Sequence, residues 1–173
     1  MKKLIATAIL LVMIPALAWA GNADSSNQVQ GYGFVGPIVR GPSSALAQRG
    51  GVSAGLGAEA LIYRGLGFGA EAGYAEGGRF PMGTGAIDFT YHFIGNKRRI
   101  KIEPFLTGGY SLYFGHDTGQ GRTENGWNVG GGASFWVTKH VALRCEVRGF
   151  AGIRFEFDAA KNFVAFRVGF TFR

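Results

Sequence analysis

The sequence has little of what a disulfide-stabilised domain, a metal protein or a typical enzyme needs. A single cysteine, Cys145, excludes an intramolecular disulfide, although many small secreted domains depend on several. The histidines, His92, His116 and His140, are scattered and form no metal-ligand cluster. Cys145 also lacks a second thiol or an obvious base nearby, so we interpret it as a small apolar strand residue. We expect no catalytic residues, no metal and no cofactor.

A nucleic-acid interface is also missing, although the formal net charge is +7. No stripe of lysine and arginine alternates with stacking aromatic residues, which is the pattern that nucleic-acid binding requires. Several basic residues gather instead in "NKRRIK" (96–101), which is typical of a solvated turn. Nucleic acid is therefore not an expected partner.

Long apolar runs are absent except at the start of the chain. There, two lysines precede "LIATAILLVMIPAL", and the small residues Ala18 and Ala20 follow at a spacing typical of a cleavage site. The run falls short of the ~20 apolar residues that a membrane-spanning helix needs. We predict a secretory signal peptide over 1–20, cleaved after Ala20, then an N-terminal segment over 21–27 and one domain over 28–173.

Glycine and aromatic residues are abundant together: 30 glycines, 15 phenylalanines, 6 tyrosines and 3 tryptophans. In "GLGFGAEAGY" (65–74) they alternate, so that Leu66, Phe68 and Tyr74 share one face. A period of two residues indicates a β-strand. A phosphate-binding glycine loop would need a helix directly after the glycines, and no amphipathic helix follows here.

About eight such alternating segments follow one another along the chain. We place them at 28–38, 51–62, 65–75, 84–94, 100–114, 126–137, 141–153 and 162–172. Most approach the ~9–11 residues of a tilted transmembrane strand. The pattern predicts an all-β domain without a packed helical layer.

The connections between these segments alternate between long and short. The long, polar connections are 40–51, 75–85, 115–125 and 154–161, and the short ones are 63–65, 94–99 and 138–140. Membrane up-and-down barrels combine tight periplasmic turns with longer external loops. We therefore predict an eight-stranded antiparallel transmembrane β-barrel with both ends of the domain on the periplasmic side.

Charged residues alternate with apolar ones in "LRCEVRGF" (143–150). A turn at 138–140 that pairs Val137 with Val141 sets each large charged residue opposite a small one: Arg144 opposite Ser134, Glu146 opposite Gly132 and Arg148 opposite Gly130. Pairing Ile62 with Leu66 does the same and sets Glu59 opposite Gly69 and Glu71 opposite Gly57. Small residues opposite large ones are how a narrow barrel fits side chains into its interior.

We therefore predict that the charged residues face the lumen. The candidates for a buried ion-pair network are Glu59, Glu71, Asp88, Arg144, Glu146, Arg148 and Arg167. Eight strands leave an interior that side chains just fill, so we favour a plugged lumen over a charge-selective conduit. The other face must then meet lipid, and its predicted residues are Leu56, Leu66, Phe68, Tyr74, Ile87, Phe89, Tyr91, Phe93, Ile102, Leu106, Tyr110, Leu112, Trp127, Val129, Phe135, Leu143, Val147, Val164, Phe166, Val168, Phe170 and Phe172.

Three stretches carry a resemblance to a known family. "EPFLTGGYSLYFG" (103–115), "LRCEVRGF" and "FVAFRVGFTFR" (163–173) resemble strands of the small outer-membrane β-barrel family of the OmpA/OmpX type. The resemblance implies a Gram-negative-type outer membrane and no agreed activity. It also implies that the barrel-assembly machinery reads the alternating aromatics of the last strand, Phe166, Phe170 and Phe172.

We expect a non-enzymatic role in envelope structure or surface interaction. The alternatives are a small conducting pore and a lipid A deacylase-like enzyme on the same barrel. Deacylases resemble one another around a His-x-Ser-Asn run that is absent here, and Ser111 near His116 and Asp117 makes a poor triad. A soluble lipocalin-like barrel would have an apolar lumen and a polar outside, the reverse of this pattern.

Lipids of the outer membrane, lipopolysaccharide and the assembly machinery are the expected partners. An extracellular partner would meet the long loops. Apolar loop residues are the candidates for that contact, with capping of the barrel rim as the alternative: Phe80, Pro81, Met82, Phe155 and Phe157.

Overall fold

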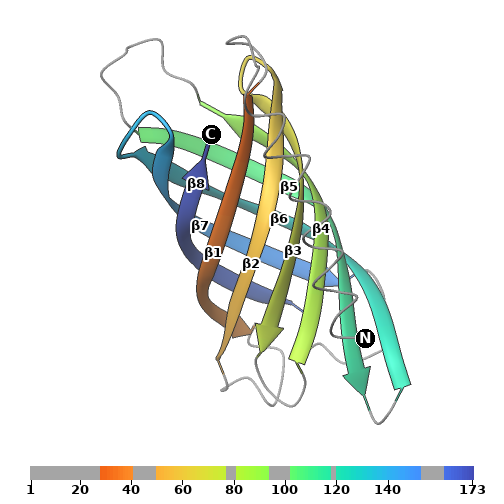
Figure 1. Cartoon of the computed structure of the whole chain (residues 1–173). Coiled ribbons are helices and arrows are strands. Elements are labelled where there is room, and N and C mark those ends of the chain that lie inside the picture. Colours follow the sequence, from red (N-terminus) through yellow and green to blue (C-terminus); the bar gives the residue numbers. More distant parts are fainter. Residues whose placement is uncertain (1–27, 41–49, 77–80, 94–101, 118–119, 153–161) are drawn as a thin grey trace, which may run out of the picture.

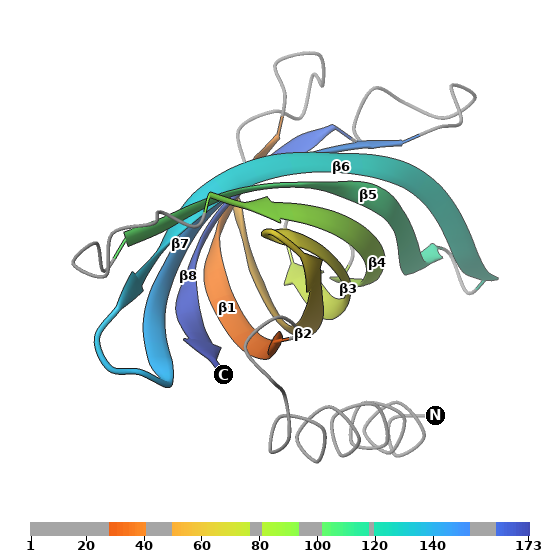
Figure 2. The ribbon, with the colours of Figure 1, turned by 90° about the horizontal axis from the view of Figure 1, so that it is seen from above.

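The computed structural model describes residues 28–40, 50–76, 81–93, 102–117, 120–152 and 162–173, so the predicted signal peptide and the segment 21–27 lie outside them. The strands are β1 (Gln28–Arg40), β2 (Gly51–Tyr63), β3 (Leu66–Glu76), β4 (Pro81–His92), β5 (Ile102–Asp117), β6 (Gln120–Trp136), β7 (Val141–Gly152) and β8 (Phe163–Phe172). Each strand pairs with its neighbour in the chain, and β8 pairs antiparallel with β1 (Figures 1 and 2). The predicted closed eight-stranded antiparallel barrel is confirmed.

The strands have one buried face and one exposed face because their sequences alternate. In β3 and β8 nearly every second residue is buried inside the barrel, while the residues between them are exposed. The outer face is apolar: Phe89, Trp127 and Val129 are 62%, 60% and 70% exposed. All the residues predicted for this face are exposed there except Tyr110 and Leu143, which are half-buried.

Membrane-spanning helices are not part of the described structure: none of its helices is long and apolar enough for a crossing.

The predicted register is confirmed for two hairpins. Between β6 and β7, Arg144 pairs with Ser134 and Arg148 with Gly130. Between β2 and β3, the registers opposite Glu59 and Glu71 are likewise those predicted, with Gly69 and Gly57 as partners.

The predicted pairing of Ile62 with Leu66 was wrong. Tyr63 pairs with Leu66 instead, and the register shifts between Leu61 and Tyr63. The reason lies in the turn, where Arg64 and Gly65 have φ angles of 45° and 90°. Two positive φ angles in succession form the tight two-residue turn whose twist matches that of a hairpin. β2 therefore runs one residue further than predicted, to Tyr63, with a bulge at Ile62.

The connection predicted over 115–125 is largely strand. β5 continues to Asp117 and β6 begins at Gln120, and these two residues pair with each other. Strands pair through their backbones, so apolar alternation is needed only where the barrel wall meets lipid. This segment is polar and rich in glycine, and for that reason the sequence predicted a loop here. For the same reason β3 reaches Glu76 and β4 begins at Pro81, inside the predicted loop 75–85. The predicted short turn 94–99 lies outside the described residues.

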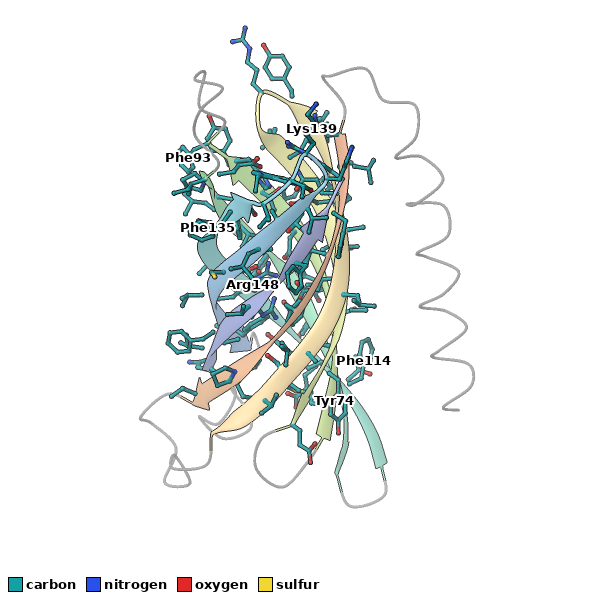
Figure 3. All side chains as sticks on the ribbon, turned by 60° about the vertical axis from the view of Figure 1, so that its left-hand side comes forward. Tyr74, Phe93, Phe114, Phe135, Lys139 and Arg148 are labelled. Carbon is teal, nitrogen blue, oxygen red and sulfur yellow. The ribbon has the colours of Figure 1, made fainter. Side chains whose placement is uncertain are left out.

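We distinguish the two ends of the barrel by the strand connections that lie there. The turn end contains the turns at Arg64–Gly65 and Thr138–His140 together with Arg173, and the hairpin end contains the tip at Asp117 and Gln120. In Figure 3, Lys139 marks the turn end, Tyr74 and Phe114 lie toward the hairpin end, and Arg148 lies between them inside the barrel.

Candidate functional site: the charged lumen

The lumen holds the seven predicted charged residues at its middle height. All are buried, with between 0% and 6% of each residue exposed. They come from strands on opposite sides of the barrel, β2, β3 and β4 on one side and β7 and β8 on the other, so their side chains meet across the lumen. The alternation that points them inward is the same that points their apolar neighbours outward.

Arg148 lies at the centre of the network and is fully buried. One of its terminal nitrogens, Nη1, donates to Asp88 Oδ2 at 2.8 Å and lies 3.3 Å from Glu71 Oε2, while its Nε donates to Glu146 Oε1. Three carboxylates from three strands therefore converge on one guanidinium, whose planar array of donors suits several acceptors at once.

The other two arginines complete the network on either side. Arg144 donates to Glu59 Oε1 at 3.1 Å and to Glu146 Oε2 at 3.2 Å. Arg167 donates to both oxygens of Glu71 at 3.0 Å, and its Nη1 lies 3.8 Å from Glu146 Oε1. Glu146 is therefore the one carboxylate among the described residues that all three lumenal arginines approach.

Aromatic rings hold the guanidinium planes of these arginines. Arg144 lies between the rings of Tyr32 and Phe105, at 4.3 and 3.9 Å from their centroids. Arg167 lies 4.0 Å from the centroid of Phe34. Stacking on ring faces stabilises a guanidinium and restricts its rotation, so the network is fixed by packing as well as by ion pairs.

Neutral polar residues of β5, β6 and β1 extend the network. The amide of Asn128 donates to Asp88 Oδ1 at 2.8 Å and to Ser111 Oγ at 2.9 Å. The hydroxyl of Tyr32 donates to Glu71 Oε2 at 3.3 Å. Most acceptor oxygens of the central carboxylates therefore have a donor, which is the condition under which buried charges are tolerated.

A second polar cluster lies toward the turn end, around His92. The Nδ1 of His92 lies 2.7 Å from Glu103 Oε1, and its Nε2 lies 3.3 Å from Glu59 Oε2. Both partners are carboxylates, so the two ring nitrogens can donate together only in the imidazolium form. The indole of Trp136 donates to the second oxygen of Glu103 at 2.8 Å, and Arg173 lies over the Trp136 ring at 3.7 Å. This cluster covers the lumen at the turn end.

An apolar cluster fills the lumen toward the hairpin end. Phe150 and Phe163 stack with their centroids 4.6 Å apart, and Tyr113 meets both rings edge-on. The buried members are Ile38, Ala75, Tyr113, Phe150, Phe163 and Ala165, and Met82 packs against them. The placement of Pro81 and Met82 in a loop was therefore wrong: both belong to β4, and Met82 packs against the apolar cluster.

Some buried polar atoms in the lumen have no hydrogen-bond partner among the described residues. They include both amide atoms of Gln30 and the hydroxyls of Thr90, Thr107 and Thr171. Buried polar groups without a protein partner are usually satisfied by water. We therefore expect the space between the charged network and the barrel wall to be hydrated.

The other predicted residues fall into two groups. Phe166, Phe170 and Phe172 lie on the outer face, at 45%, 53% and 52% exposure, and Cys145 is a half-buried free thiol on that face. Phe80, Phe155 and Phe157, and the side chains of His116 and Asp117, lie outside what the structure describes. Within the described residues, no group of three or more histidine, cysteine or acidic residues is arranged to hold a metal ion.

Several residues of the lumen were not predicted as part of its network: Tyr32, Glu103, Asn128, Trp136 and Arg173. A usable signal was present for Glu103. Ile102 and Leu106 were predicted to face outward, so strict alternation would have placed the side chain of Glu103 on the inward face. The contact of Arg173 with Trp136 had no such signal, since it depends on how β8 ends beside the turn at 138–140.

An apolar outer wall around a charged lumen is the arrangement of small outer-membrane β-barrel proteins, and solved structures share this fold. One is Neisserial surface protein A (NspA), at a TM-score of 0.67 and 19% identity, over 87% of this chain and 99% of that one. The N-terminal β-barrel domain of Pseudomonas aeruginosa OprF is similar at a TM-score of 0.62 and 12% identity, over 85% and 96% of the two chains. The outer membrane protein OprG from Pseudomonas aeruginosa is similar at 0.57 and 10%, over 83% and 96%.

These identities establish a shared fold and nothing finer. No protein-family model matches the sequence. No curated protein matches it at the sequence level either.

Proposed function

We propose that the chain is an integral outer-membrane β-barrel protein with a closed lumen and a non-enzymatic role in envelope structure or surface interaction. The main support is the distribution of side chains across the barrel wall: the large apolar side chains are exposed on the outside, and the charged side chains are buried inside. Water-soluble proteins rarely expose contiguous apolar patches larger than a few hundred Å². An apolar band around a closed barrel fits the hydrocarbon of a membrane.

The filled lumen supports a structural role over conduction. Three arginines and four carboxylates cross the middle, and the stacked rings of Phe150 and Phe163 lie toward the hairpin end. Eight strands leave a bore that such side chains occupy. We expect planar-bilayer recordings to show no large, stable conductance, and steady passage of sugar-sized solutes would contradict a closed lumen.

The contacts of the lumenal residues support a non-enzymatic role. Ser111 is buried and accepts a hydrogen bond from Asn128, while both ring nitrogens of His92 face carboxylates. Across the described part of the chain, no serine, threonine or cysteine side chain is hydrogen-bonded to a histidine ring. Nucleophilic catalysis needs such a pairing.

The orientation and the route to the membrane are part of the proposal. The turn end faces the periplasm and the hairpin end faces outward, among lipopolysaccharide and any extracellular partner. Export removes residues 1–20, so mass spectrometry of the mature protein should find Gly21 at its start. The assembly machinery then recognises the last strand through Phe166, Phe170 and Phe172.

Fractionation of cells that express the full chain tests the proposal. We expect the protein in the outer-membrane fraction, released by detergent and not by salt or alkali. Protease added to intact cells should cut near Arg122 and leave the segment 97–101 intact. Release by alkali alone would contradict a membrane-spanning barrel, and the opposite cleavage pattern would invert the orientation.

A further inference from the structure

The turn end exposes basic side chains directly beside the apolar outer wall. In the β2–β3 turn, Ile62 and Tyr63 are 58% and 61% exposed, and the guanidinium of Arg64 lies 5.1 Å from the centroid of the Tyr63 ring. In the β6–β7 turn, Val137 is 67% exposed and Lys139 follows it by two residues, also exposed. Each turn therefore places a positively charged side chain next to an exposed apolar side chain.

These turns lie on opposite sides of the rim. The order of strands around the closed barrel separates the β2–β3 turn from the β6–β7 turn by half the circumference. Arg173, after β8, donates to the backbone oxygen of Lys139 at 3.1 Å and adds a third basic residue to this end. Arg64, Lys139 and Arg173 form what we call the basic rim. The β4–β5 connection, outside the described residues, contains Lys97, Arg98, Arg99 and Lys101 in its sequence.

Acidic residues of this end do not neutralise Arg64 and Lys139, two of the three members of the basic rim. Glu103 is engaged by His92 and Trp136 and lies 4.0 Å from Arg173, and its side chain is 12% exposed. Glu59 is buried in the lumen. Among the described residues, no carboxylate forms an ion pair with Arg64 or Lys139.

The depth of the basic rim matches lipid headgroups. Arg64 directly follows Tyr63, and Lys139 lies two residues beyond Val137, so each charge lies within about 7 Å of the apolar wall at ~3.3 Å per strand residue. The headgroup layer extends roughly 5–7 Å beyond the hydrocarbon on each side of a bilayer. Both charges therefore reach the level of lipid phosphates, whereas a partner lying farther from the membrane would meet them only at their outer edge.

We propose that the basic rim selects anionic phospholipids, through the phosphate groups of lipids such as phosphatidylglycerol, in the leaflet that surrounds the turn end. Clusters of basic residues next to a membrane attract anionic lipids electrostatically. Their distribution around the rim suits a shell of lipids better than a single docked protein. The inference rests on the proposed membrane location, and with the turn end in the periplasm the leaflet is the periplasmic one.

The experiment reconstitutes the folded mature protein, residues 21–173, in phosphatidylcholine vesicles with traces of spin-labelled lipid. Electron spin resonance then measures the motionally restricted fraction of spin-labelled phosphatidylglycerol and, separately, of spin-labelled phosphatidylcholine. We expect phosphatidylglycerol to associate about threefold more strongly than phosphatidylcholine at low salt, and this preference should fall as ionic strength rises.

Two variants with the same loss of charge separate the rim from the net charge. Arg64→Asn/Lys139→Gln removes the two charges of the basic rim that form no ion pair among the described residues, and asparagine tolerates the positive φ of position 64. The matched control, Arg40→Gln/Arg122→Gln, removes two charges near the hairpin end. We expect the first variant to lose most of the preference for phosphatidylglycerol and the control to retain it.

The outcomes are distinguishable from failure of the proposed function. A reconstituted protein that restricts neither labelled lipid would contradict the membrane barrel itself. Restriction of both lipids to the same extent would overturn the basic rim as a selective site while leaving the barrel intact. An equal loss of preference in both variants would assign it to net charge and also overturn the inference.

Discussion

Strand β7 places opposite chemistries on its two faces within one short stretch. Arg144, Glu146 and Arg148 point inward and are buried among carboxylates and rings. Val147, between two of them, points outward and is 47% exposed. A substitution on the inner face must be absorbed by fixed neighbours from other strands, whereas lipid chains can adapt around the outer face. Position on the strand, more than residue type, should therefore decide how damaging a change is.

The largest effect should follow from removing the central cation of the inner face. Arg148→Met keeps a long side chain but leaves Asp88, Glu71 and Glu146 without their shared guanidinium. Removing one side of a buried ion pair costs about 3–5 kcal/mol, because the remaining charge is uncompensated. Urea unfolding in lipid vesicles measures the loss in the free energy of unfolding.

A double variant tests whether uncompensated charge causes that loss. Arg148→Met/Asp88→Leu removes one of the stranded carboxylates together with the arginine. We expect it to be more stable than Arg148→Met alone by at least about 1 kcal/mol, a coupling typical of residues in contact. Strictly additive losses would show that Arg148 acts through its volume and not through its charge.

A smaller loss should follow in the apolar half of the lumen. Phe150→Ala removes a ring that stacks on Phe163 and is 5% exposed. Core substitutions of this kind cost ~3–5 kcal/mol, and we expect the lower value, about 3 kcal/mol, because the partly buried Met82 can move into part of the space. Phe150→Leu should cost under about 1.5 kcal/mol. Equal unfolding midpoints for wild type and Phe150→Ala would exclude the apolar cluster as a source of stability.

A smaller difference still should separate two adjacent glycines of β6. A Cβ added at Gly132, on the inner face, would overlap the backbone oxygen of Cys145 and lie 2.9 Å from both Cα of Glu146 and Cζ of Phe105, so the neighbouring strand would have to shift. Forcing extra volume into a packed interior costs about 1–3 kcal/mol, and we expect about 2 for Gly132→Ala. At Gly131 an added Cβ would lie 3.0 Å from the flexible end of Leu106 and 3.1 Å from the backbone oxygen of Phe105, so Gly131→Ala should cost less, no more than about 1 kcal/mol. Equal effects would contradict the inside–outside assignment of β6.

The sequence predicts the barrel and the inward direction of its charges because both follow from alternation. Arg144, Glu146 and Arg148 occupy every second position, and a turn at 138–140 is enough to place small residues opposite them. Neither inference requires knowledge of the rest of the wall.

Which charges pair across the lumen could not be predicted from alternation. Arg144 meets Glu59 and Arg167 meets Glu71 because of the tilt of the strands and the stagger at which β8 closes on β1. The extension of β5 and β6 past the apolar wall was missed for a different reason, since backbone pairing of Asp117 with Gln120 leaves no apolar pattern in the sequence.

The two faces of β7 can be compared most directly at neighbouring positions, by urea unfolding in vesicles of Glu146→Ala and Val147→Ala. Glu146→Ala removes the carboxylate that Arg144, Arg148 and Arg167 approach, and we expect a loss of about 3 kcal/mol. Val147→Ala removes apolar contact that lipid chains can partly replace, and we expect a loss under about 1 kcal/mol. A larger loss for Val147→Ala than for Glu146→Ala would contradict the charged lumen.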